Sequence, residues 1–344
     1  MQVRFWTHEL KFRHPFTISK GTKTHQPTLV IELTMGPWKG YGEAPSISYY
    51  PTSALQEMVK QLELKVKFIE KFAFTDPERF WHFLHHLLPG QHFLIAALDI
   101  AGWDLYGQLK GKPLSTLWGL STSVKPITDF TIGIDSPEKM VQKMTERPWP
   151  LYKIKVGSAD DFSRLELLRT MTTSPFRIDA NAGWGFDQAV EWIPKLIELG
   201  VDLIEQPLAK DDWEGMKKLK QISSIPLFAD ESCVGEEDVE KCAEAFHGIN
   251  IKLTKCSGIT PARRMIKKAR MLGLQLMLGS MNESTIGSAA LAHLSPLVDH
   301  LDIDGPLLLE EDLAVGLRYE NGSIFTSDLP GLGTQYKGLI KSEH

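Results

Sequence analysis

An alternation of strand-like and helix-like segments repeats eight times between residues 128 and 305. Each short apolar segment is separated from the next by an amphipathic stretch of helix length, as in SPEKMVQKM and TPARRMIKKARMLG. Such alternation builds parallel sheets, and eight units close a (β/α)8 barrel of the α/β class. The expected strands span 128–134, 151–156, 176–181, 201–206, 225–232, 248–254, 274–280 and 300–305.

The two ends of the chain lack this rhythm. Near the N-terminus, strand-like VRFWTHEL, PTLVIELTM and WKGYGEAP precede helical patterns over 53–71, 77–88 and 92–109, an order typical of an α+β module. We therefore predict an α+β capping domain over 1–122 and the barrel over 123–310. The remaining segment, 311–344, contains the strand-like SIFTS, and we expect it to return to the capping domain.

Composition excludes several classes of protein. The formal net charge of −5 argues against a nucleic-acid partner. No stretch approaches the roughly 20 apolar residues of a membrane span, and the N-terminus lacks a secretory apolar region. Three scattered cysteines, Cys233, Cys242 and Cys256, fit a reducing compartment. We expect a cytoplasmic protein without a membrane partner, and the sequence leaves homo-oligomerisation open.

Polar residues lie near the carboxyl end of nearly every later strand, which is the face where barrels of this type place their active sites. From Lys155 to Asp302, successive members are 22 to 28 residues apart by subtraction of their numbers, or about one strand–helix unit. We therefore expect them at one height of the barrel. They are Lys155, Asp179, Glu205, Asp230, Lys252, Ser280, Asp302 and Asp304.

Three carboxylates fall on the neighbouring third, fourth and fifth strands: Asp179, Glu205 and Asp230. Carboxylates that converge in a half-buried place repel one another unless a cation lies between them. Oxygen ligands of this kind suit a hard divalent ion, Mg²⁺ before Ca²⁺ or Mn²⁺. The alternative is that each carboxylate pairs with a basic residue or caps a helix.

Two lysines in LYKIKVG, Lys153 and Lys155, are two residues apart, so their side chains share one face of a strand. Lys252 lies four strands away, which is opposite to Lys155 in a ring of eight. A lysine with its usual pKa of about 10.4 is a poor base at neutral pH. We expect burial and neighbouring cations to lower the pKa of Lys155 toward about 7–8. The alternative is a set of surface lysines whose side chains reach solvent.

Two bases on opposite sides of a bound carbon, together with a metal, favour a 1,1-proton transfer. One lysine would remove the proton α to a carboxylate, and the other would return a proton on the far side. Mg²⁺ would stabilise the enediolate between these steps. The sequence thus indicates racemisation or epimerisation.

The series LYKIKVG, RIDANAGW, LIEQPL, FADES, INIKLTKCSG and GSMNES resembles the muconate-lactonizing subgroup of the enolase superfamily. GYGEAP and AALDIAGWDLYGQLKGKPL resemble its N-terminal domain. The resemblance implies one Mg²⁺ per subunit and an acid/base pair of Lys155 and Lys252. Lys255 lies where relatives vary, and we do not include it. The implied metal ligands are Asp179, Glu205 and Asp230, with Lys153, Asn181 and Glu231 as further site residues.

LDIDGP (301–306) places Asp302 and Asp304 on one face of the eighth strand, with no lysine or arginine in that stretch. The pair resembles the DxD signature of dipeptide epimerases, where it holds the α-ammonium group of the substrate. The same resemblance implies that Thr131, Ser280 and Met281 contact the dipeptide. The alternative is that the two carboxylates cap helices or turns.

Specificity in this family comes largely from capping-domain loops, here about 14–25 and 44–53. Relatives acting on L-Ala-D/L-Glu carry an arginine at the place of Gly21, although Lys20 or Lys23 could substitute for it. With Tyr49 and Tyr50 nearby, we expect Ala-Xaa dipeptides with a small or apolar Xaa.

Two rival functions stay open at this point. One is an o-succinylbenzoate synthase, N-succinylamino acid racemase or cycloisomerase of the same subgroup, which would share the lysines and the metal ligands. The other is a non-catalytic small-ligand binder. Loss of a base or a metal ligand would favour such a binder, and none is missing.

Overall fold

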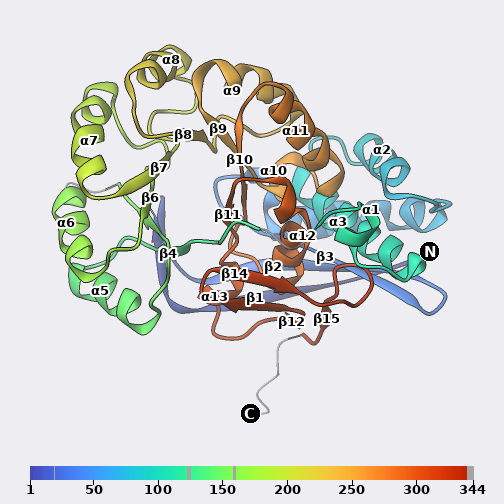
Figure 1. Ribbon diagram of the computed structural model, residues 1–344. Helices are drawn as coiled ribbons and strands as arrows, with labels where there is room; N and C mark the ends of the chain where they lie inside the picture. The colour runs from blue at the N-terminus through green and yellow to red at the C-terminus, as the bar shows by residue number, and fades with distance from the viewer. Residues whose placement is uncertain (19, 122–124, 158–159, 339–344) are drawn as a thin grey trace.

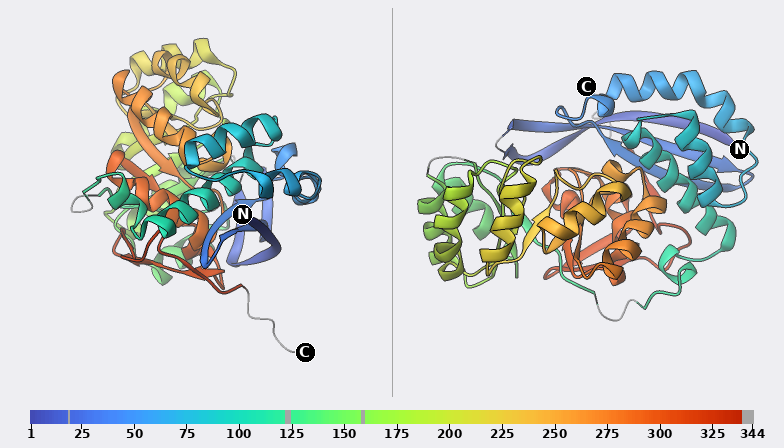
Figure 2. Two further views of the ribbon diagram at one scale, coloured as in Figure 1. Left: turned by 90° about the vertical axis from the view of Figure 1, so that its right-hand side faces the viewer. Right: turned by 90° about the horizontal axis from the view of Figure 1, so that it is seen from above.

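The computed structural model describes residues 1–344 except 19, 122–124, 158–159 and 339–344. A ring of strands surrounded by helices forms the larger part, and a three-stranded sheet with its own helices lies against it (Figures 1 and 2). The protein therefore has two parts, a barrel and a cap.

The barrel strands follow one another in chain order, and each pairs in parallel with the next. The ring closes where Thr128 bridges Leu301 and the backbone N–H of Asp129 donates to Leu301 O at 3.3 Å. This arrangement confirms the predicted (β/α)8 barrel. The strands are β4 (Phe130–Ile132), β5 (Tyr152–Lys155), β6 (Phe176–Asp179), β7 (Val201–Glu205), β8 (Leu227–Ala229), β9 (Gly248–Ile251), β10 (Gln275–Gly279) and β11 (His300–Asp302).

Helices return the chain between successive strands and cover the outside of the ring (Figure 1). Several begin at a capping side chain, such as Ser136 before α5 and Asp212 before α8, each accepting from a backbone N–H in the first turn. The helices are α5 (Pro137–Glu146), α6 (Asp161–Met171), α7 (Phe186–Glu198), α8 (Trp213–Ile222), α9 (Val239–Ala245), α10 (Leu253–Cys256), α11 (Ile259–Met271), α12 (Thr285–Leu294) and α13 (Gly305–Leu308).

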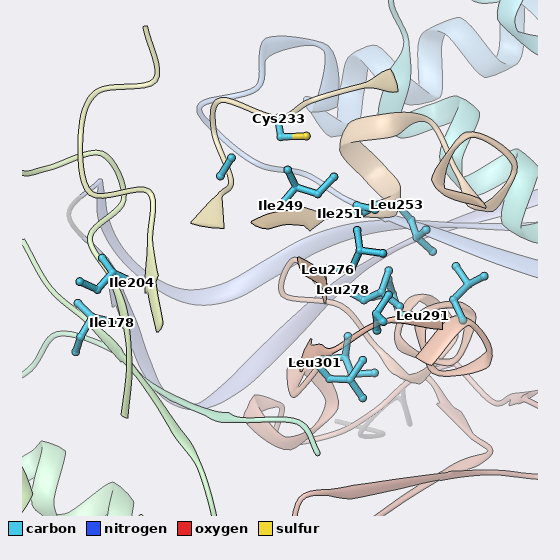
Figure 3. Close-up of a cluster of buried hydrophobic side chains, with 14 of the residues drawn as sticks. Ile178, Ile204, Cys233, Ile249, Ile251, Leu253, Leu276, Leu278, Leu291 and Leu301 are labelled. Atoms are coloured by element: carbon cyan, nitrogen blue, oxygen red, sulfur yellow. The ribbon is translucent and has the colours of Figure 1, made fainter. Parts of the chain in front are cut away.

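Alternation along the barrel strands separates an apolar outer face from a polar inner one. Ile178 and Ile204 belong to the main apolar core between strands and helices (Figure 3), whereas the next residue on each strand faces the barrel interior. One layer deeper in the barrel, Leu203, Phe228 and Met277 form a small apolar cluster of their own. This cluster lies beneath the polar side chains, which face the carboxyl ends of the strands.

The cap sheet consists of β1 (Gln2–Ile18), β2 (Gly21–Met35) and β3 (Trp38–Pro45), paired antiparallel in that order. Its helix α3 packs directly on β3, where a Cβ atom on Gly42 would collide with the backbone of Ala97. Glycine is thus required for this close approach. The cap helices are α1 (Leu55–Lys71), α2 (Pro77–Leu87), α3 (His92–Lys110) and α4 (Leu114–Leu117).

Helix α3 is buried over most of its length, and it also joins the cap to the barrel. The buried carboxylate of Asp99 accepts hydrogen bonds from Thr260 N (2.9 Å) and Thr260 Oγ1 (2.7 Å) at the start of α11. In the described part of the chain, none of the helices is both long enough and apolar enough to cross a membrane.

The C-terminal segment contacts the cap through short strands and turns. The backbone N–H of Leu332 donates to Asp104 Oδ1 on α3 at 2.8 Å, and Tyr336 Oη lies 2.7 Å from His8 Nε2 on β1. The expected SIFTS strand is present as β14, paired with β13. The domain limits stay a prediction. The segment contains β12 (Ala314–Val315), β13 (Leu317–Glu320), β14 (Ser323–Thr326) and β15 (Gln335–Tyr336).

Candidate active site

The strand ends bring the predicted lysines and carboxylates together at the mouth of the barrel. The register pairs Lys155 with Asp179, and Asp179 with Glu205, across three neighbouring strands. Asp230 directly follows β8, and Lys252 directly follows β9. The even spacing seen in the sequence therefore corresponds to one height in the structure.

Lys153 lies at the centre of the first group of charges. Its Nζ is 2.6 Å from Glu205 Oε2, 2.6 Å from Asp302 Oδ2 and 3.1 Å from Asp179 Oδ2. All of these side chains are buried. Lys155, on the same face of β5, forms a short ion pair with Asp179 Oδ2. The two lysines of LYKIKVG thus both point inward, as the alternation along a strand requires.

A second group surrounds Asp230. Lys252 Nζ lies 2.8 Å from Asp230 Oδ2, and Lys255 Nζ lies 2.6 Å from Asp230 Oδ1. Lys255 also donates to the backbone oxygens of Asp230 (2.5 Å) and Cys233 (2.9 Å). Sequence reasoning left Lys255 out. Helix α10 begins directly after the strand-end Lys252, and its turn brings Lys255 back into the barrel mouth.

Asn250 and Gln206 are two more site residues that sequence reasoning missed. Asn250 Nδ2 donates to Glu205 Oε1 at 2.8 Å, and Gln206 Oε1 accepts from the backbone N–H of Asp230 at 3.1 Å. Asn250 stands two residues before Lys252, so the alternation that paired Lys153 with Lys155 could have identified it. Gln206 has a positive φ of 38° at the exit of β7, where the strand pattern ends.

The charges of the site shift one another's pKa values in opposite directions. Burial disfavours the charged form of Asp230, but Lys252 and Lys255 outweigh it and hold the pKa of Asp230 well below its usual value. Burial and the charge of Asp179 raise the pKa of Glu205 to about 7. Burial disfavours the ammonium form of Lys252, but the carboxylates of Asp230 and Glu205 outweigh it and raise its pKa. The ammonium form of Lys252 is therefore favoured in this state.

The chemistry of the donors suits a hard cation, but their present arrangement does not enclose one. Among the described residues, no three carboxylate, imidazole or thiol groups surround a common point closely enough to ligate a metal ion. Ammonium groups lie between the carboxylates instead. Buried oxygens without a hydrogen-bond partner, Asn181 Oδ1 and Asn250 Oδ1, lie on residues that contact Asp179 and Glu205. These oxygens and carboxylates are the ligand types that Mg²⁺ prefers.

The two aspartates of LDIDGP meet different partners. Asp302 pairs with Lys153, whereas Asp304 Oδ2 accepts from the backbone N–H of Thr131 at 2.6 Å. The stretch itself contains no lysine or arginine, but Lys153 reaches Asp302 from β5, which is separated from β11 by β4 alone. Burial and the charge of Asp302 raise the pKa of Asp304 to about 7, so Asp304 is the one left without a neutralising lysine beside it.

A cavity lies between the barrel mouth and the cap, and both predicted acid/base lysines line it. Of the residues expected to contact substrate, Ser280 and Met281 also line the cavity, while Thr131, Lys153, Asp302 and Asp304 are not among its lining residues. The barrel contributes Lys155, Asn181, Asp230, Lys252, Ser280, Met281 and Asn282, and the cap contributes Phe16, Ile18, Gly21, Lys23, Ile47 and Tyr49.

The cap lysines differ in their partners. Lys20 Nζ lies 3.3 Å from Glu231 Oε1 and 4.2 Å from the centre of the Tyr49 ring. Lys23 lines the cavity, and its Nζ lies 3.3 Å from the neutral oxygen Gln26 Oε1. Burial lowers the pKa of Lys23. The predicted supporting residue Glu231 thus holds Lys20 at the edge of the site.

Comparison with known families agrees with this architecture. The enolase C-terminal domain-like family matches residues 137–339, and the mandelate racemase / muconate lactonizing enzyme N-terminal domain matches residues 1–119. The chain therefore belongs to the enolase superfamily.

Its relatives place it more narrowly, among the dipeptide epimerases, which are isomerases. The L-Ala-D/L-amino acid epimerase of Maribacter sp. (strain HTCC2170) is 47% identical over 334 residues, 97% of this chain and 98% of the relative. The protein of that name from Flavobacterium johnsoniae is 46% identical over 97% and 99%. The dipeptide epimerase of Cytophaga hutchinsonii, in complex with Mg and D-Ala-L-Val, is 28% identical over 98% and 96%, with a TM-score of 0.92.

Proposed function

We propose that the protein is a Mg²⁺-dependent dipeptide epimerase that inverts the α-carbon of the C-terminal residue of a dipeptide. The observation that carries this proposal is the pair Lys155 and Lys252, which line one cavity from strands four places apart in the ring. A carbon held between them is within reach of a base on one side and an acid on the other. The names of the relatives support a dipeptide as the substrate.

The two lysines divide the proton transfer between them. A neutral lysine amine takes the α-proton, the C–H bond breaks, and its electron pair passes into the carboxylate to give an enediolate. The ammonium group on the other side then donates a proton to the same carbon, which inverts its configuration. Each lysine ends in the protonation state in which the other began. The raised pKa of Lys252 favours its ammonium form, which is the form of the proton donor.

Asp179, Glu205 and Asp230 would hold one Mg²⁺ per subunit, since they supply carboxylate oxygens at neighbouring strand ends. When bound, the ion supplies positive charge where the substrate carboxylate accumulates negative charge. The buried amide of Asn250 orients Glu205, and Gln206 holds the backbone that carries Asp230. These contacts fix the carboxylates before any ligand arrives.

Asp302 and Asp304 would bind the α-ammonium group of the dipeptide at the other end of the site. Asp304 is suited to this because no lysine neutralises it directly and the backbone N–H of Thr131 fixes its orientation. Substrates of synthases and cycloisomerases lack such an ammonium group. The buried Asp304 carboxylate therefore favours the dipeptide epimerase over these alternatives.

The side-chain pocket favours Ala-Xaa dipeptides with a small or apolar Xaa. Its cap side presents Phe16, Ile18, Ile47 and Tyr49. Burial lowers the pKa of Lys23, so its ammonium form is less favoured and binds an acidic side chain less well. Apolar lining of this kind binds apolar groups by removing their surface from water.

A mass-spectrometric screen of dipeptide libraries in D₂O with Mg²⁺ tests the proposal. Epimerisation exchanges the α-proton, so each true substrate gains one deuterium at its C-terminal residue. We expect exchange concentrated on Ala-Xaa with apolar Xaa. Exchange at no dipeptide, with Mg²⁺ binding intact, would contradict the dipeptide assignment and favour a synthase or cycloisomerase.

A further inference from the structure

A second cavity lies beside the barrel mouth, at the carboxyl end of β4, where the end of β1 crosses it. Ile134, two residues after the end of β4, donates its backbone N–H to Thr17 O on β1 at 2.9 Å. The cavity has a volume of about 230 Å³, far more than the roughly 10–15 Å³ that one water requires. Its walls come from β1, β4, α5 and α13.

Two guanidinium groups line this cavity without a carboxylate to neutralise them. Arg13 on β1 and Arg147 at the end of α5 form no ion pair with any residue in the described ranges. Burial lowers the pKa of Arg147, the positive charge of Arg13 lowers it further, and the carboxyl group of Asp304 offsets only part of this effect. The two like charges therefore destabilise each other unless an anion lies between them.

The other charged groups of the lining already have partners. Lys143 Nζ lies 3.0 Å from Asp135 Oδ2, and His14 Nε2 lies 2.8 Å from Glu146 Oε2. Glu310 lies outside the lining, and the charge of Arg13 contributes to the lowering of its pKa. Its Oε2 already lies 2.8 Å from Lys11 Nζ. The uncompensated positive charge of the cavity thus belongs to the two arginines.

Apart from Thr131, the rest of the lining is apolar or glycine. The Arg147 guanidinium lies 5.7 Å from the centre of the Phe130 ring, and Leu307 and Leu308 of α13 complete the wall. An apolar wall strengthens electrostatic attraction by keeping water away, and this applies to the half-buried Arg147, whereas Arg13 is exposed. Planar guanidinium groups match the geometry of a carboxylate, which they bind through paired N–H donors. We propose that this cavity binds a carboxylate between Arg13 and Arg147.

The location of the cavity suggests where a carboxylate could come from. Thr131 lines it, and the backbone N–H of Thr131 also holds Asp304, the proposed partner of the substrate ammonium group. Phe16 lines both this cavity and the one that contains the catalytic lysines. One source is an acidic side chain on the N-terminal residue of a dipeptide substrate, and this source rests on the proposed function. The other source is a free carboxylate.

The first arm of the test measures binding of a free anion. Succinate is titrated calorimetrically into the full-length protein at constant ionic strength with chelator present, so that no metal in the catalytic cavity can bind it. We expect Arg13→Gln and Arg147→Gln each to weaken binding at least about tenfold, as the loss of a charge-assisted hydrogen bond does. The matched control, Arg79→Gln, removes one positive charge from the exposed face of α2 and leaves binding unchanged.

The second arm measures the substrate source. The ratio of kcat/KM for L-Glu-L-Leu to that for L-Gln-L-Leu compares two side chains of similar shape that differ in charge. If the substrate supplies the carboxylate, wild type prefers L-Glu at least about tenfold, and the preference disappears in both arginine variants. If a free anion is the ligand, succinate binding responds to the variants while the ratio does not.

Insensitivity of both readouts to Arg13 and Arg147 would overturn the carboxylate site. Absence of epimerisation with every dipeptide would instead count against the proposed function, and the succinate titration would still decide whether the site exists. Thermal unfolding of each variant identifies any that fail to fold, and Arg147→Lys, which retains the charge, then replaces Arg147→Gln. Partial succinate binding by Arg147→Lys supports the site, and binding equal to wild type in every variant contradicts it.

Discussion

Two lysine pairs face each other across the barrel mouth, and each contains one inner and one outer lysine. On one side, Lys153 has a 2% exposed side chain and Lys155 has 11%. On the other side, the corresponding fractions are 1% for Lys255 and 9% for Lys252. The outer lysine of each pair lines the catalytic cavity and the inner one does not. Position along the barrel axis thus separates lysines available for chemistry from those that hold carboxylates.

The inner lysines differ in what they hold. Lys153 is within 3.1 Å of three carboxylates contributed by β6, β7 and β11. Lys255 meets one carboxylate, Asp230, and two backbone oxygens from the segment after β8. Lys153 therefore joins strands on both sides of β5, whereas Lys255 fixes one local turn. Two lysines at similar depth in the barrel therefore have different structural roles, because they neutralise different numbers of carboxylates.

Removal of either outer lysine should have the largest effect on activity. We expect Lys155→Ala and Lys252→Ala each to reduce epimerisation by about 10²–10⁴-fold or more, the range typical of a general acid or base. The measurement is α-proton exchange in D₂O, with circular dichroism and Mg²⁺ titration as checks on fold and metal binding. Lys139→Ala on the exposed face of α5 is the matched control. A Lys252→Ala variant with full activity would overturn the two-base mechanism.

Removal of Lys153 should lower the free energy of unfolding more than removal of Lys255. Lys153→Met leaves buried carboxylates without their cation, so we expect the free energy of unfolding to fall by about 3–5 kcal/mol. Lys255→Met leaves Asp230 paired with Lys252, and Asp230 O keeps its hydrogen bond from Cys233 N, so mainly Cys233 O loses its donor. A loss of about 1–3 kcal/mol is therefore expected. Urea unfolding of the metal-free protein measures both. Equal losses would contradict the difference between the two sides.

Much of this arrangement was predictable from the sequence because side chains alternate along a strand. That rule places Lys153 with Lys155 and Asp179 beside Glu205, and the structure shows both. It does not apply past the end of a strand, so it gives no prediction for Lys255, which a helical turn presents to the site. It also cannot identify partners on strands that are not adjacent, such as Lys153 for Asp302. Those contacts depend on how the barrel closes.

A difference in pH dependence should distinguish the two aspartates of the eighth strand. Burial disfavours the charged form of Asp302, but Lys153 and other lysines outweigh it and lower its pKa, whereas the pKa of Asp304 is raised to about 7. The protonated form of Asp304 therefore stabilises the fold fully below about pH 4, and this contribution is lost as pH rises through about 7.

The size of that loss is at most about 4 kcal/mol, from a pKa difference of roughly three units at 1.36 kcal/mol each. Asp304→Asn should remove this fall in the free energy of unfolding between pH 4 and 7, measured by urea titration without metal or substrate. Asp302→Asn is the comparison. Ionised Asp302 stabilises the fold above about pH 4, so this substitution should lower the free energy of unfolding at neutral pH. An unchanged pH profile in Asp304→Asn would show that Asp304 is already ionised.

The smallest expected effect on activity concerns the two cap lysines, Lys20 and Lys23. As with the barrel lysines, one of them lines the cavity and the other does not. Lys23 lines it and Lys20 is held by Glu231. Lys23→Met should change kcat/KM for L-Ala-L-Leu by no more than about threefold, since it replaces a partly desolvated ammonium group with an apolar chain of similar length. The same substitution should lower kcat/KM for L-Ala-L-Glu more strongly, because it removes the cation that an acidic side chain would meet. Lys20→Met is the matched control. If the ratio of kcat/KM for the two substrates changes more in Lys20→Met than in Lys23→Met, the specificity depends on the Lys20–Glu231 pair instead.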